Sequence, residues 1–337
     1  MELQVIWFVL IAVLFIAYFF LEGFDFGVGI LMPFISRDNV DRRVTLNTIG
    51  PFWDANEVWL ITAGGAMFAA FPHWYATLFS GFYLPLFLIL LALIVRAVGF
   101  EFRGKHNTDW WRRTADQFIF WGSLLPPFLW GVALTNIVMG LPIGADMNFR
   151  GGLLGLLKPY ALLGGLAATC LFTLHGALFL TLRTTDDMKA RAETIARRMW
   201  LPTGAVLLLF AVLGYWQTVL FEGLGLVPGT LPMLTILSFV AGYFALGLKR
   251  NTVAFAATGL TIALGTAVVF AGLFPQVMPS SLDPDYSLTI YNASSSQLTL
   301  KVMTFVAIIF VPVVLAYQAW SYYVFRQRVT RDAIPRH

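Results

Sequence analysis

The chain has 337 residues, of which 58% are hydrophobic and only 12% are charged, with a mean hydropathy of +0.76 and a net charge of +4. This composition excludes a soluble globular domain, whose surface needs about 25% charged residues. It also argues against nucleic acid as a partner, because the basic residues form short clusters between apolar segments instead of one basic region. We therefore expect an all-α polytopic membrane protein.

Apolar windows of about 20 residues occur about nine times along the chain. They begin near positions 3, 52, 81, 117, 158, 200, 231, 252 and 298. These windows are too long and too evenly apolar for barrel strands, so each predicts a transmembrane helix. We expect one integral membrane domain over 1–337. It comprises a four-helix bundle over 1–140, a second over 158–275, and a ninth helix over 298–326 with a cytoplasmic tail.

The basic residues predict the orientation of these helices, because Lys and Arg concentrate on the cytoplasmic side of a membrane. The odd-numbered connections and the C-terminal tail hold 19 of the 22 Lys and Arg residues. These are Arg37, Arg42, Arg43, Arg96, Arg103, Lys105, Arg112, Arg113, Arg183, Lys189, Arg191, Arg197, Arg198, Lys249, Arg250, Arg326, Arg328, Arg331 and Arg336. The even-numbered connections hold Arg150, Lys158 and Lys301. We expect an extracytoplasmic N-terminus and a cytoplasmic C-terminus.

The first expected span contains an unusual acidic pair near its cytoplasmic end. Glu22 and Asp25 follow about 20 mostly apolar residues and lie three positions apart, on one face of a helix. Ionised side chains are costly in a membrane, so carboxyl groups kept there generally handle protons, ions or a cationic partner.

Two further acids, Asp54 and Glu57, begin the second expected span, which starts on the same side of the membrane. One interpretation is structural: these acids favour a helix start and pair with Arg37, Arg42 or Arg43 at the interface.

The other interpretation is a proton entry route formed by Glu22, Asp25, Asp54 and Glu57 together. A carboxyl group that is partly removed from water can bind and release a proton near neutral pH, and acids at successive depths can pass it inward through water. The sequence leaves both interpretations open.

Histidine is scarce, which bears on haem binding. His175 is the only one of the four histidines in an expected span, since His73, His106 and His337 fall in connections or the tail. Haem b sites in membrane bundles need His/His or His/Met axial pairs, so we do not expect this chain alone to hold several haems. We favour a hydrogen-bonded or proton-relaying His175 over a metal ligand.

A short internal similarity relates the first and fifth expected spans. The sequence LEGFDF occupies 21–26, and LHGALF occupies 174–179. If these segments belong to two structural repeats, each repeat is a four-helix bundle and His175 takes the position of Glu22.

Several longer strings resemble the second subunit of cytochrome bd-type quinol oxidases. They are EGFDFGVG at 22–29, WDANEVWLITAGG at 53–65, VGFEFR at 98–103, and MPSS at 278–281 followed by SSSQLTL at 294–300. The resemblance covers nearly the whole chain. It implies nine helices, in the bacterial cytoplasmic membrane, that pair pseudosymmetrically with a haem-bearing subunit I.

By the same resemblance, the complex oxidises quinol and reduces dioxygen to water, with haem b and haem d in the partner subunit. This chain would complete the fold around those haems and help to deliver protons. A small single-helix accessory subunit, lipid and quinone are further implied partners. Asp25 and Asp54 match the acidic positions of the family, whereas Glu22 replaces an aspartate, Phe52 stands where some relatives have histidine, and the connection over 221–230 is shorter than in some relatives.

Two alternatives remain at the level of sequence. Buried acids, glycine-rich helices and repeats would also suit a proton-coupled secondary transporter, which would act without haem. A purely structural membrane subunit would leave proton delivery to its partner, so that Asp25→Asn would not change turnover.

Overall fold

The computed structural model describes residues 2–106, 108–218, 220 and 229–333. Most of the connection expected at 221–230, together with Arg336 and His337 of the tail, lies outside these residues. The α-helices in chain order are α1 (Leu3–Ile35), α2 (Asn39–Ile49), α3 (Trp53–Ala70), α4 (Pro72–Gly81), α5 (Tyr83–Phe102), α6 (Asp109–Val138), α7 (Pro159–Arg183), α8 (Asp186–Gln217), α9 (Thr230–Gly247), α10 (Asn251–Leu273) and α11 (Gln297–Val324). Strands β1 (Gln276–Met278) and β2 (Leu288–Thr289) form one antiparallel pair, and short 3-10 turns occur at Leu153–Leu156 and Pro284–Tyr286.

Eight of the described helices are long and apolar enough to cross a membrane, namely α1 and α5 to α11. The remaining expected span forms α3, an 18-residue helix that is not among these eight; Asp54 and Glu57 lie in its first turns. Helix α3 ends at Ala70, since Pro72 opens α4 and the residue before a proline, Phe71, is disfavoured in the α conformation. The all-α membrane architecture is therefore confirmed, and eight of the about nine expected spans are helices apolar enough to cross a membrane.

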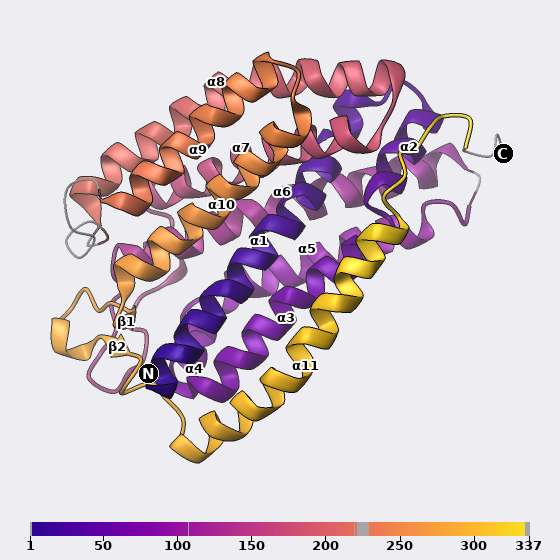
Figure 1. The fold of residues 1–337 in the computed structure, drawn as a ribbon. Coiled ribbons are helices and arrows are strands. Elements are labelled where there is room, and N and C mark those ends of the chain that lie inside the picture. Colours follow the sequence, from indigo (N-terminus) through magenta and orange to yellow (C-terminus); the bar gives the residue numbers. More distant parts are fainter. Residues whose placement is uncertain (1, 107, 219, 221–228, 334–337) are drawn as a thin grey trace.

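Helix α1 is the central element and packs against α3, α6, α7 and α10 (Figure 1). It crosses α7 closely, since a Cβ on Gly27 would lie 2.8 Å from the Cα of Gly176. Beside this crossing, the rings of Phe24 and Phe179 stack with centroids 4.1 Å apart. The first helices of the two expected bundles are thus in direct contact, while the division into bundles remains a prediction.

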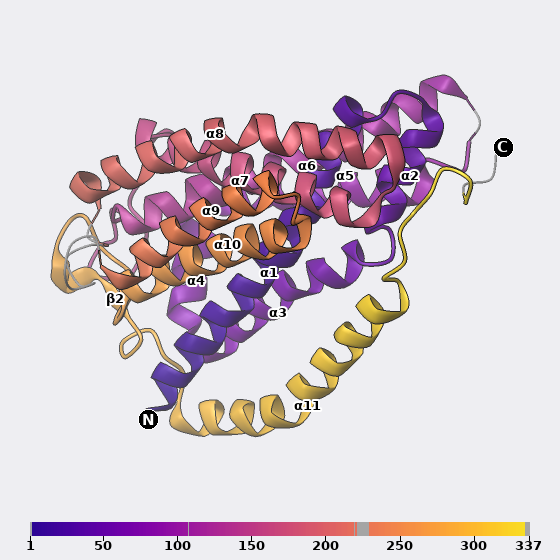
Figure 2. The same ribbon diagram turned by 45° about the horizontal axis from the view of Figure 1, so that its top comes forward.

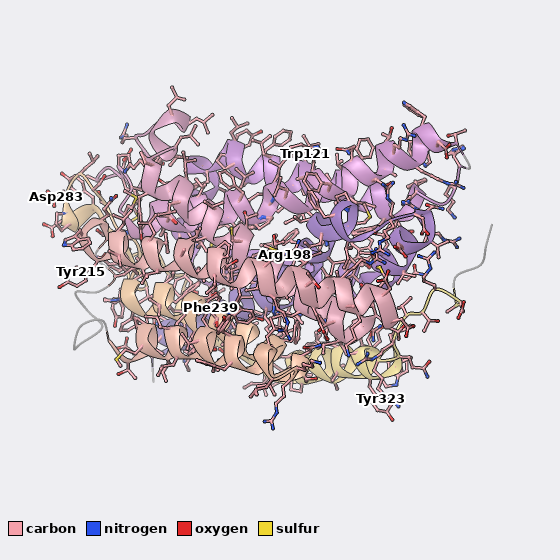
Figure 3. The ribbon with its side chains drawn as sticks, turned by 90° about the horizontal axis from the view of Figure 1, so that it is seen from above. Trp121, Arg198, Tyr215, Phe239, Asp283 and Tyr323 are labelled. Carbon is pink, nitrogen blue, oxygen red and sulfur yellow. The ribbon has the colours of Figure 1, made fainter. Side chains whose placement is uncertain are left out.

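The two ends of the molecule differ in character. The start of α1 and the segment that follows α11 lie at opposite ends of the helical array (Figure 1), and Asp283 and Tyr215 lie far from Tyr323 along the same axis (Figure 3). At the end that holds the β1–β2 pair, the connections bind one another: Ser280 Oγ donates to the Ile143 carbonyl (2.8 Å).

The opposite end holds ion pairs that fix the basic segments. Asp116 of α6 accepts hydrogen bonds from Arg42 Nη1 (2.6 Å) and Arg103 Nε (2.6 Å). Asp41 of α2 accepts from Arg191 Nη2 of α8 (2.8 Å) and also pairs with Arg331 of the C-terminal segment.

The C-terminal segment is held against this end of the bundle. The Val329 amide donates to the Arg183 carbonyl at the end of α7 (2.8 Å). The Arg331 guanidinium also binds Asp38 (2.7 Å) and thereby lowers the pKa of that carboxyl from its usual value. The segment after α11 therefore contacts both the end of α7 and the start of α2.

The Gly27–Gly176 crossing gives a stability prediction. We expect Gly27→Ala to destabilise the purified protein by roughly 1–3 kcal/mol, because the added methyl group forces α1 and α7 apart. Gly265→Ala in α10 is the matched control, since nothing lies within 4 Å of a Cβ at that position. Thermal unfolding measures both, and equal melting temperatures would contradict the close crossing.

Candidate functional site

Arg96 of α5 is fully buried and lies between carboxylates from two other helices. Its Nη1 contacts Oε1 of Glu22 in α1 and lies 3.2 Å from Oε1 of Glu57 in α3. The Phe26 and Phe100 rings cover the guanidinium, with ring centroids 4.8 Å and 5.1 Å from Cζ. The guanidinium therefore joins α1, α3 and α5 through ion pairs and cation–π contacts that water does not screen.

The sequence analysis placed Arg96 in the third connection, and this was wrong. The residue lies inside α5, whereas Arg103 marks the end of that helix. The count of basic residues treated Arg96 as part of the following cluster. The signal that could have identified it is its position as the only basic residue within the apolar run 83–102, because a charge alone in such a segment needs a buried partner.

Asp25 lies on the same side of α1 and is also fully buried. Its Oδ2 accepts a hydrogen bond from Asn56 Nδ2 of α3 (2.6 Å). Asn56 Oδ1 in turn accepts from Tyr322 OH (2.8 Å) and Gln318 Nε2 (3.1 Å) of α11. One amide thus links α1, α3 and α11, and none of Asn56, Gln318 and Tyr322 was identified as a site residue from the sequence.

The buried groups are unequal in charge. Three carboxyl groups, Glu22, Asp25 and Glu57, interact electrostatically with the single guanidinium of Arg96. The second oxygens of Glu22 and Asp25 have no hydrogen-bond partner among the described residues. Because buried charges without compensation are costly, the cluster favours binding of a proton by at least one of its carboxyl groups.

The four predicted acids form a series of decreasing exposure. Asp54 is exposed, the Glu57 side chain is 19% exposed, and Glu22 and Asp25 are 0% exposed. The structure brings Glu22, Asp25 and Glu57 together around Arg96, while Asp54 lies outside the buried cluster at the start of α3.

The expected interfacial pairing of these acids is wrong for Glu57, which pairs with Arg96. Arg37 pairs with Asp187 (2.8 Å), and Arg42 pairs with Asp116. The first two arginines of that connection therefore bind acids of α8 and α6.

His175 of α7 occupies a different environment. Its Nδ1 lies 2.8 Å from Thr258 Oγ1, and its ring stacks on Phe255 with centroids 4.3 Å apart. The rings of Phe20 and Phe24 lie 5.4 Å and 6.0 Å away. Within the described residues, no hydrogen bond joins His175 to the acids, so the structure does not bring this predicted residue into the cluster.

The second ring nitrogen of His175, Nε2, is buried and has no hydrogen-bond partner among the described residues. Aromatic rings pack directly around the imidazole of His175, as around a core histidine. His73 is exposed on α4, His106 follows α5, and the described membrane helices hold no second histidine for an axial pair. Within the described residues, no group of three or more His, Cys, Asp or Glu side chains could hold a metal ion.

Comparison with known proteins identifies relatives over the whole chain. The family model described as cytochrome bd terminal oxidase subunit II matches residues 3–325. Cytochrome bd ubiquinol oxidase subunit 2 of Bacillus subtilis is 46% identical over 329 residues, which cover 98% of this chain and 97% of that protein. Cytochrome bd-I ubiquinol oxidase subunit 2 of Escherichia coli K12 is 36% identical and covers 99% of this chain and 97% of its own length.

A solved chain of the bd oxidase from Geobacillus thermodenitrificans has the same fold, with a TM-score of 0.78 at 19% identity. The alignment covers 96% of this chain and 97% of that chain. The family match and the curated relatives confirm the resemblance found in the sequence and argue against a secondary transporter. This chain therefore belongs to the cytochrome bd terminal oxidase subunit II family, and it is a subunit of a membrane-bound oxidoreductase complex.

Proposed function

We propose that this chain is the second subunit of a quinol oxidase of the bacterial cytoplasmic membrane and that it supplies a proton-uptake route to the site of dioxygen reduction. The names of two relatives, which are ubiquinol oxidase subunits, support quinol as the substrate of the complex. The observation that carries the proton role is the series of acids that ends in three buried carboxyl groups around one guanidinium.

In the proposed route, protons enter at Asp54 and pass through Glu57 to the buried cluster. Arg96 neutralises Glu22 by direct contact, whereas Asp25 receives its hydrogen bond from the neutral amide of Asn56. Asp25 is therefore the carboxyl group whose charge is least compensated, and we assign to it the buried proton-binding position. His175, which bonds to Thr258 and not to the acids, is outside the route.

Haem b and haem d belong to subunit I in this proposal, because His175 is the one histidine in the described membrane helices and its ring is packed against Phe255. When bound there, the haems carry the electrons to dioxygen. Each electron that reduces dioxygen consumes one proton, so a buried reaction centre needs a route for protons. This chain contributes the carboxyl groups of that route and covers part of the haem-bearing subunit.

The outer face of α3 is the proposed contact surface for subunit I. Glu57 is partly exposed there, and nothing lies within 4 Å of a Cβ at Gly64 or Gly65. Lipid is a poor neighbour for a carboxylate, and small residues let another helix approach closely. Helix α11 borders this face, turns away from α3 along part of its length (Figure 2), and has Leu300 as its single buried residue. A small accessory subunit and a bound quinone remain predictions.

The proton route predicts a specific effect of Asp25→Asn in the intact complex. We expect quinol-driven oxygen uptake to fall about tenfold or more, because the asparagine accepts the Asn56 hydrogen bond but cannot carry a proton. Asp54→Asn should have a smaller effect, because Asp54 is exposed at the start of α3 and water can take its place at the entry to the route. Oxygen consumption is measured together with haem content by visible spectroscopy.

The matched control for this experiment is His175→Asn, which keeps a polar atom near Thr258 and should leave proton-dependent turnover intact. Unchanged oxygen uptake in both Asp25→Asn and Asp54→Asn, with full haem content, would favour a purely structural subunit instead.

The ion cluster predicts strong coupling between Arg96 and Glu22. Arg96→Gln should destabilise the complex by about 3–5 kcal/mol, because it leaves buried carboxylates without their cation. The double variant Glu22→Gln/Arg96→Gln should recover part of that loss, since it removes a charge of each sign. Thermal unfolding of all three variants tests the pair, and strictly additive losses would argue against it.

The distribution of basic residues predicts the orientation of the chain. The experiment uses a background variant in which Cys170 is replaced, and cells from which any outer membrane has been removed. In such intact cells, the introduced cysteine of Asp283→Cys should react with a maleimide that cannot cross the membrane. A cysteine at Lys105 should react only after the cells are broken. The opposite pattern would reverse the proposed N-terminus-outside topology.

A further inference from the structure

A second polar site lies away from the acid cluster, at the end of the molecule that holds the basic connections. It is a cavity of about 310 Å³ between the end of α7, the start of α8 and the connection from α9 to α10. Four basic side chains line it: Lys189, Lys249, Arg250 and Arg328.

The cations around this cavity are poorly compensated by acids. Glu193 lies 3.8 Å from Lys189, and Arg328 Nη1 donates to the Thr184 carbonyl (3.2 Å). No ion pair within 4 Å is found for Lys249 or Arg250 among the described residues. Cations that converge on one cavity repel one another and raise its affinity for an anion.

Lys249 occupies a position where glycine is usual. Its φ is 59°, and the Arg250 amide donates to the Ala245 carbonyl (2.9 Å), which is the hydrogen-bond pattern of a helix C-terminus closed by a left-handed residue. A lysine there is strained relative to glycine. The Lys249 side chain lines the cavity, which would explain why a lysine occupies this position instead of a glycine.

Asn251 adds a buried polar group to the same wall. It is 8% exposed, its Nδ2 donates to Glu193 Oε1 (2.6 Å), and its Oδ1 has no partner among the described residues. It also begins the 23-residue helix α10, whose free N–H groups favour a negative charge. The cavity therefore offers cations that would bind an anionic group of a ligand. It also offers one buried acceptor that would bind a hydrogen-bond donor beside that group.

An apolar strip continues from the cavity along α10. Val253 lines the cavity and is 51% exposed, and Leu260, two turns further along the same face, is also 51% exposed. A free inorganic anion would make no apolar contacts with this strip, whereas a lipid acyl chain would cover it.

We propose that this cavity binds the headgroup phosphate of an anionic glycerophospholipid. The phosphate lies among Lys249, Arg250 and the start of α10. A hydroxyl of the headgroup donates to Asn251 Oδ1, and an acyl chain follows Val253 and Leu260. The site is independent of the proposed proton route and lies at the membrane interface, where basic side chains attract anionic lipid.

The test uses the intact oxidase complex in detergent and measures bound lipid by native mass spectrometry during titration with phosphatidylglycerol. The variant is Lys249→Gln/Arg250→Gln. The control, Lys105→Gln/Arg198→Gln, removes the same charges from exposed positions that do not line the cavity; Arg198 is labelled on α8 in Figure 3. Phosphatidylcholine and inorganic phosphate are the comparison ligands.

We expect the variant to weaken phosphatidylglycerol binding about 30-fold, since each cation near an anionic lipid contributes about fivefold. The control and wild-type complexes should bind alike, and phosphatidylcholine should bind weakly to both. Equal affinity in variant and control, or no phosphatidylglycerol binding by the wild type, would overturn the proposal. Inorganic phosphate that binds as tightly and displaces the lipid would show a free-phosphate site instead. Oxygen uptake plays no part in these readouts, so they are separate from the test of the proton route.

Discussion

The buried contact of Arg96 with Glu22 is the constraint on which the arrangement of the acidic site depends. A guanidinium that is 0% exposed needs a carboxylate beside it, and this requirement holds α5 against α1 and brings Glu57 of α3 to the same point. Because the single cation lies at Glu22 and Glu57, it leaves Asp25 with only a neutral hydrogen-bond donor. The Arg96–Glu22 ion pair and the proposed proton-binding role of Asp25 therefore have the same origin: three buried carboxyl groups share one cation.

Helix α1 contributes to both the acidic cluster and the contact with α7. One face holds Glu22 and Asp25 toward α3 and α5, and another crosses α7 at Gly27 with the closest backbone approach of that pair. Across this crossing the surroundings change from ionic to aromatic, since His175 is packed against Phe255 and bonded to Thr258. The internal similarity of 21–26 and 174–179 therefore joins two segments whose polar residues lie in unlike environments.

Much of the architecture could be predicted from the sequence, because apolar length and charge clustering are local properties. The same holds for Glu22, Asp25 and Glu57, whose charge stands out in apolar segments. Asn56, Gln318 and Tyr322 could not be found in this way, since their contacts join residues 262 and 266 positions apart. Arg96 was missed for another reason: proximity in sequence to a basic cluster concealed its burial. Asp54 was expected with the other acids, yet helix geometry leaves it exposed.

Infrared difference spectroscopy of the reduced and oxidised complex can show whether Asp25 binds a proton during turnover. A protonated carboxyl group has a C=O stretching band that is separate from those of carboxylates and amides. We expect a redox-linked carboxyl band that is absent in Asp25→Asn and present in His175→Asn. A band unchanged in Asp25→Asn, with haem content intact, would show that the proton is carried elsewhere.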